Sequence, residues 1–299
     1  MVNKYFIKNS GVINASGVDL IDFLNRMSTN DFKLLQKDEF RKTVLTTDKG
    51  RIVDLINVLN SEKEINILTS TGFQEKIISH LDKYIIMDDV KLEKSKEEYS
   101  HFVMSGDNLK NIAKDIFHTE IENNKVYKDD IAGIIFYDNF KIETLNIICK
   151  KENEDKVKNL LKDFTEMNCE DYEFFRIKNG LPEGINEFND QINPMECGLD
   201  EFISFKKGCY IGQEVIARLD SQGKRPKQMV IIDSDYEIVT DDKIFDEANK
   251  EVGFITSSVN FENKYSALGF IRSVNLDYGK NYNAINKSDS RKIKISKIN

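Results

Sequence analysis

Apolar residues recur every three or four positions in five stretches of the first 180 residues. This spacing places them on one face of a helix, so the pattern predicts helices near 19–27, 73–84, 107–118, 157–164 and 170–180. Asp19 precedes the first stretch, and we expect it to cap that helix. Gly180 closes the last stretch and is the residue type that most often ends a helix.

Runs rich in β-branched and aromatic residues predict a short opening strand and turn at 4–14, and strands at 42–60, 65–69, 99–104, 131–138 and 140–149. The run at 42–60 predicts a hairpin, because Asp48-Lys49-Gly50 supplies a turn in its middle. The order of strands and helices favours α+β units of ferredoxin-like type over a doubly wound parallel sheet.

The helical spacing stops after residue 227, and four strand-like runs follow at 228–233, 251–259, 267–273 and 291–298. Such runs, spaced by turn residues, predict a small antiparallel barrel. We therefore expect two domains, an α+β region over 1–227 and a β-barrel over 228–299. The three prolines of the chain lie between 182 and 226, which predicts a shaped loop segment where a site is favoured.

The composition of the 299 residues is that of a globular chain, with 40% hydrophobic and 31% charged residues. The formal charge is 43 − 51 = −8, which argues against a chain devoted to binding nucleic acid or an anionic membrane. No apolar run approaches the roughly 20 residues that span a bilayer. We expect a cytoplasmic monomer with no membrane or nucleic-acid partner.

Four cysteines are spread along the chain without C-x-x-C spacing, and the three histidines do not cluster with them. We therefore expect no metal site and no disulfide. Cys209 has a distinctive setting between Gly208 and Gly212, after two lysines and just before a helical pattern. Nearby positive charge and a helix N-terminus both favour a thiolate, so this setting predicts a reactive thiol. The alternative is a buried cysteine in a glycine turn.

The segment from Lys207 to Glu214 resembles the K-G-C-Y-x-G-Q-E signature of the YgfZ family at every fixed position. This family comprises folate-binding relatives of the glycine-cleavage T-protein that support iron–sulfur cluster assembly or repair. Further similar blocks are Thr29–Asp31, Leu45–Ile52, Asn193–Leu199, Gly253–Ser257 and Ala267–Arg272. The resemblance implies a cloverleaf of α+β domains around a central folate channel, with a C-terminal antiparallel β-barrel.

The resemblance also implies functional residues. Asp54 occupies the place of the T-protein acid that serves one-carbon chemistry, although strand propensity alone leaves a solvent-facing position open. Arg176, Lys178 or Arg225 would pair with the tail carboxylates of folate. Lys178 stands where T-proteins have a pterin-binding glutamate, so Glu183 or Glu196 would have to replace that acid. The remaining residues expected to bind folate come from the signature and the helix after it: Lys207, Tyr210, Gln213, Glu214 and Arg218.

Three functions follow as hypotheses. The first is a tetrahydrofolate-binding accessory protein for the assembly or repair of iron–sulfur client proteins, with Cys209 redox-active. The second is a folate-dependent aminomethyl- or methyltransferase of the T-protein type, with Asp54 as the acid or base. The third is a non-catalytic interaction protein on the same fold.

Overall fold

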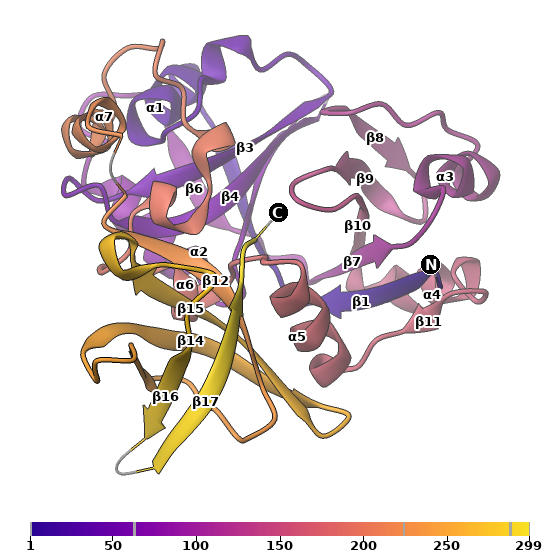
Figure 1. Cartoon of the computed structure of the whole chain (residues 1–299). Helices are drawn as coiled ribbons and strands as arrows, with labels where there is room; N and C mark the ends of the chain where they lie inside the picture. Colours follow the sequence, from indigo (N-terminus) through magenta and orange to yellow (C-terminus); the bar gives the residue numbers. More distant parts are fainter. Residues whose placement is uncertain (1, 62–63, 224, 287–288, 299) are drawn as a thin grey trace. The chain divides into compact units, whose positions relative to one another are not determined.

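The computed structural model describes residues 2–61, 64–223, 225–286 and 289–298, which divide into two compact units (Figure 1). The first unit comprises residues 1–48, 53–167 and 201–213. The second unit comprises residues 49–52, 168–200 and 214–299.

The first unit contains a five-stranded sheet in the order β3-β4-β5-β2-β6. Its strands are Glu39–Thr46, Ile52–Ser61, Glu64–Thr69, Gly11–Ser16 and Lys91–Lys94. Helices α1 (Leu20–Met27) and α2 (Gln74–Asp82) turn apolar faces toward this sheet. Their buried residues, such as Phe23 and Ile77, share one hydrophobic cluster with strand residues such as Ile56.

The first unit also contains a six-stranded sheet in the order β11-β1-β7-β10-β9-β8. Its strands are Thr165–Glu166, Lys4–Lys8, Tyr99–Ser105, Thr144–Lys150, Gly133–Asp138 and Val126–Asp129. Helices α3 (Leu109–Phe117) and α4 (Glu154–Leu160) bury their apolar residues in the core of this sheet. A smaller cluster that includes Val12, Phe40 and Phe136 joins the two sheets.

The second unit is built on a closed barrel of six antiparallel strands in the order β12-β15-β14-β13-β16-β17 (orange to yellow in Figure 1). These strands are Lys227–Ser234, Lys264–Arg272, Glu251–Phe261, Lys243–Phe245, Tyr282–Asn286 and Asp289–Ser296. Helix α5 (Cys169–Lys178) packs on β14 and β15, and the short α6 (Gly184–Glu187) contacts β14. Helix α7 (Gln213–Ser221) leads into the barrel.

The predicted α+β class with a terminal antiparallel barrel is confirmed, and three local predictions need correction. The run at 4–14 forms two strands, β1 and β2, which belong to different sheets. The short strands β6, β8, β11, β13 and β16 were not predicted. The side chain of Asp19 does not cap α1, because its Oδ2 accepts the backbone N–H of Asp89 at 2.8 Å.

The domain boundary at 227/228 stays a prediction. Limited proteolysis between Ser221 and Lys227, a segment in which residue 224 lies outside the described residues, is the measurement that tests it. In the part of the chain that the structure describes, no helix is long and apolar enough to cross a membrane. No group of three potential metal-ligating side chains occurs there either.

Candidate functional site

Asp54 lies on β4 in the first unit and is completely buried. Its Oδ2 accepts the backbone N–H of Ser70 at 2.9 Å, and its Oδ1 accepts the Ser70 hydroxyl at 2.6 Å. Among the described residues, no lysine or arginine forms a salt bridge with it. Burial raises the pKa of Asp54 to about 6, although the two Ser70 hydrogen bonds oppose that rise. The carboxyl group therefore exchanges its proton close to neutral pH.

The sheet explains how Ser70 reaches Asp54. Ser70 directly follows β5, which runs antiparallel beside β4, so a residue 16 positions away along the chain lies next to the aspartate. Lys76, on α2, donates from Nζ to the carbonyl of Val53 at 3.0 Å and so lies near this carboxylate. Sequence reasoning found Asp54 but missed Ser70, because only the pairing of the two strands brings them together.

The signature segment is fixed in the first unit through Lys207. The Lys207 ammonium donates to three backbone carbonyls, those of Asn25 at 2.6 Å, Ser28 at 2.5 Å and Asn30 at 2.7 Å. Such carbonyls at the end of helix α1 attract a cation. Burial lowers the pKa of Lys207 to about 8. Lys207 therefore ties its loop to the end of α1.

Further hydrogen bonds fix the same loop. Ile211 donates its N–H to the carbonyl of Arg26 at 3.1 Å, and its carbonyl accepts the Thr46 hydroxyl at 2.7 Å. Tyr210 is buried, and the Lys207 nitrogen lies 4.8 Å from the centre of its ring. Gln213 is the first residue of α7 and donates its N–H to the carbonyl of Tyr210. The predicted glycine-rich turn before a helix is thus present.

Cys209 is exposed on this loop, as is Cys169 on α5, whereas Cys149 and Cys197 are buried. Burial raises the pKa of Cys149 to about 11, which makes that thiol unreactive near neutral pH. Of the two lysines expected to activate Cys209, Lys207 directs its ammonium to backbone carbonyls. The reactive thiol at Cys209 stays a prediction.

Glu196 lies in the second unit, in a short 3₁₀ turn (η3, Pro194–Cys197), and its side chain is completely buried. Its Oε2 accepts the N–H of Asn193 at 3.0 Å, while Arg51 and Lys227 each approach to 3.9 Å. Its Oε1 is buried and accepts no hydrogen bond from any described residue. Burial raises the pKa of Glu196. This oxygen can accept a hydrogen bond from a ligand.

Arg176, expected to hold a folate carboxylate, is 4% exposed and already saturated. Its guanidinium donates to both carboxylate oxygens of Glu173, to the Ser257 hydroxyl at 2.7 Å, to Glu187 at 3.2 Å and to the carbonyl of Leu181 at 3.3 Å. These contacts use all five N–H donors of an arginine. A folate carboxylate would have to displace one of them, so the geometry favours a structural role for Arg176.

The other cations predicted to pair with the folate carboxylates are exposed and already form ion pairs. Lys178 pairs with Asp233 at 2.5 Å, and Arg225 pairs with Asp200 at 2.8 Å. Glu214 and Arg218 lie one turn apart on α7, as expected, but no ion pair joins them among the described residues. Exposed pairs contribute about 0–1 kcal/mol, so a ligand could exchange with them at little cost. The assignment of these residues to folate stays a prediction.

A family model and a solved structure show which class of fold the chain has. Residues 7–134 match the family model described as the GCVT N-terminal domain. Over the whole chain, the fold resembles the crystal structure of glycine cleavage system aminomethyltransferase T from Bartonella henselae. The TM-score is 0.85 at 14% identity, with 99% of this chain and 86% of that chain covered. The chain therefore has the fold of this class.

The sequence relatives of the chain include three kinds of protein. The chain is 24% identical to an aminomethyltransferase of Thermosipho melanesiensis, over 90% of this chain and 77% of that protein. It is 25% identical to the tRNA-modifying protein YgfZ of Hamiltonella defensa, over 73% of this chain and 66% of that protein. It is 20% identical to a mitochondrial iron–sulfur cluster assembly factor IBA57 homolog of Dictyostelium discoideum, over 81% of this chain and 65% of that protein. The chain thus carries a match to the GCVT N-terminal domain and is similar to YgfZ, IBA57 and aminomethyltransferase proteins.

Proposed function

We propose that this protein binds a tetrahydrofolate and serves as an accessory factor in the assembly or repair of iron–sulfur proteins. The signature from Lys207 to Glu214 and the names of the YgfZ and IBA57 relatives support this role. The observation that carries the folate part is Asp54, a completely buried carboxyl group held by a serine rather than by a cation.

A buried acid with no salt-bridge partner among the described residues costs stability, and such groups concentrate at functional sites. The pterin ring of folate presents N–H groups, and a carboxylate accepts hydrogen bonds from such donors. When bound, tetrahydrofolate would supply the one-carbon chemistry of the family. Asp54 would accept a ligand N–H and hold or release a proton near neutral pH. Glu196, whose Oε1 accepts no hydrogen bond from the described residues, is a second candidate acceptor.

The second candidate function is aminomethyl transfer to tetrahydrofolate, with Asp54 as the acid or base. The aminomethyltransferase relatives and the shared fold favour it. The same resemblance speaks against it at Lys178, because an ammonium group cannot accept the pterin N–H donors that a glutamate would. The K-G-C-Y signature also marks the accessory branch of the family.

Two measurements on the purified wild-type chain separate the candidates. Isothermal titration calorimetry with tetrahydrofolate measures binding, and an assay with an aminomethylated lipoyl carrier protein measures turnover. Binding without turnover, together with lowered iron–sulfur enzyme activity in cells that lack the protein, supports the accessory role. Turnover supports the transferase. Absence of binding at high micromolar tetrahydrofolate contradicts both and leaves an interaction protein.

A further inference from the structure

Three polar side chains from separate segments of the first unit form a hydrogen-bonded chain. Ser10 lies in the turn between β1 and β2, His101 lies on β7, and Asn146 lies on β10. The Ser10 Oγ is 2.8 Å from His101 Nδ1, and His101 Nε2 is 3.0 Å from Asn146 Oδ1. A hydroxyl, an imidazole and an orienting acceptor in this order are the parts of an activated serine nucleophile.

The hydrogen bonds beyond Asn146 set the direction of the chain. The Thr144 hydroxyl donates to the carbonyl of Asp138 at 3.4 Å, so its oxygen accepts the Asn146 amide N–H at 3.1 Å. That bond turns Oδ1 of Asn146 toward His101, which must then carry its proton on Nε2. Nδ1 of His101 is left with a lone pair and accepts the Ser10 hydroxyl proton. The two ring nitrogens exchange the roles that they have in serine proteases.

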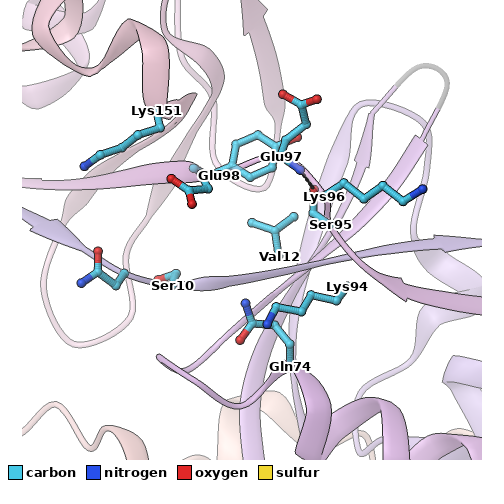
Figure 2. Close-up of a pocket in the computed structure, with 11 residues that line it drawn as sticks. Ser10, Val12, Gln74, Lys94, Ser95, Lys96, Glu97, Glu98 and Lys151 are labelled. Atoms are coloured by element: carbon cyan, nitrogen blue, oxygen red, sulfur yellow. Dashed lines mark hydrogen bonds between the residues drawn. The ribbon is translucent and has the colours of Figure 1, made fainter.

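Ser10 lines a pocket of about 430 Å³, whereas the base and its orienting residue are buried. Figure 2 shows Ser10 on one wall, with Gln74 and Lys94 below it and Glu98 and Lys151 above it in this view. A pocket of this size accommodates a small organic molecule. Imidazole and asparagine are 7% and 5% exposed, so the hydroxyl is the member of the chain that faces a ligand.

The side-chain amide of Gln74 lies close to the backbone beside the nucleophile. Gly11 follows Ser10, and a Cβ atom at this glycine would lie 2.3 Å from the amide carbon of Gln74. The Gln74 amide therefore packs against the backbone next to Ser10 and lines the same pocket. A side-chain amide at such a place can stabilise the oxygen that becomes negative when a serine attacks a carbonyl.

We propose that Ser10 is the nucleophile of a second site, separate from the folate-binding residues, that cleaves small carboxylic esters. Ser10 Oγ bonds to the ester carbonyl carbon as its proton passes to His101 Nδ1. The C–O bond to the alcohol breaks, and the leaving oxygen takes that proton. Water then attacks the acyl-serine, gives a proton to His101 and releases the carboxylic acid, while the proton returns to Ser10. No oxidant, metal or cofactor enters the balance.

A fluorophosphonate probe tests the nucleophile directly, because serine attacks phosphorus and fluoride leaves. Peptide mass spectrometry should place the label of the full-length wild-type chain on Ser10. Ser10→Ala and His101→Gln should each label at least about 100-fold more slowly, the range that a general base contributes. Ser95→Ala is the matched control, since Ser95 lines the same pocket but contacts Glu97 instead of His101. This variant should label like the wild type.

Asn146 is a positioning residue, and rescue identifies its role. Asn146→Ala should slow labelling, and Asn146→Asp should restore it, because a carboxylate also accepts the proton on Nε2. Hydrolysis of p-nitrophenyl acetate should follow the same order of variants. The proposal is overturned if the wild type labels no faster than Ser10→Ala, if the label lies elsewhere, or if His101→Gln labels like the wild type at an unchanged melting temperature. Tetrahydrofolate titration of Ser10→Ala separates this proposal from the folate function, since folate binding should be unaffected.

Discussion

Two buried charged side chains, one in each unit, have opposite kinds of hydrogen-bonding partner. Arg176 in the second unit has every N–H donor satisfied, and its partner Glu187 is completely buried and bonded through both oxygens. Asp54 in the first unit is equally buried, but a neutral serine is its hydrogen-bonding partner.

The difference separates structural charges from functional ones. A buried ion pair with complete hydrogen bonding is stable only as a set, because removing one member leaves the other charged and unpaired. A buried acid without a counter-ion lowers the stability of the fold, and its raised pKa allows it to exchange a proton near neutral pH. We therefore expect Arg176 to be needed for folding and Asp54 to be needed for activity but not for folding.

The largest effect should come from Arg176→Met. It leaves Glu187 charged and buried, and the free energy of unfolding should fall by about 3–5 kcal/mol. Urea denaturation followed by circular dichroism measures this loss. Lys178→Met on the same helix is the control, because its pair with Asp233 is exposed and should contribute at most about 1 kcal/mol. Equal losses in the two variants would show that the buried hydrogen bonds of Arg176 do not stabilise the fold.

Asp54→Asn should stabilise the protein in a pH-dependent way. The pKa of Asp54 is raised from 3.8 to about 6 in the folded state, so the unfolded state loses its proton first as the pH rises. The wild type therefore loses stability between about pH 4 and pH 6, and the asparagine variant lacks this loss.

The free energy of unfolding of Asp54→Asn, relative to wild type, should thus rise by about 3 kcal/mol from pH 4 to pH 7. Chemical denaturation at several pH values measures the difference. A difference that does not change with pH would mean that the Asp54 carboxyl titrates normally in the folded protein.

Lys207→Met should have a smaller effect, about 1–3 kcal/mol, because three backbone carbonyls lose their charged donor but no buried charge is left unpaired. Lys206→Met is the neighbouring control and should change the melting temperature little, since Lys206 is exposed. Differential scanning calorimetry compares the two. If Lys206→Met is the more damaging variant, the anchoring of the loop to α1 is wrongly assigned.

Cys209→Ser should leave the melting temperature nearly unchanged, because its side chain is exposed. Alkylation of the wild type by iodoacetamide should modify Cys209 fastest of the four thiols, with the equally exposed Cys169 as the internal reference. Peptide mass spectrometry over a pH series gives the rates. If Cys169 reacts as fast at pH 7, the segment is a backbone turn rather than a reactive site.

Periodicity and contiguous motifs were enough to predict much of the local structure of the chain. Helix faces such as that of α1, the terminal barrel and the turn before α7 follow from local spacing. The three-residue strand β13 offers too short a pattern. The Ser70 contact of Asp54 requires the pairing of two strands, and the carbonyl contacts of Lys207 reach across more than 170 residues. Arg176 illustrates the same limit, because its saturation depends on Ser257, 81 residues away.

The most direct test of the account is calorimetric titration of tetrahydrofolate into wild type and Asp54→Asn at neutral pH, with the unfolding of both proteins measured in parallel. If Asp54 is a functional acid, the variant should bind at least about tenfold more weakly, the equivalent of about 1.4 kcal/mol, while its free energy of unfolding equals or exceeds that of the wild type. Unchanged binding, or weaker binding accompanied by loss of the fold, would contradict the claim that Asp54 is a functional acid.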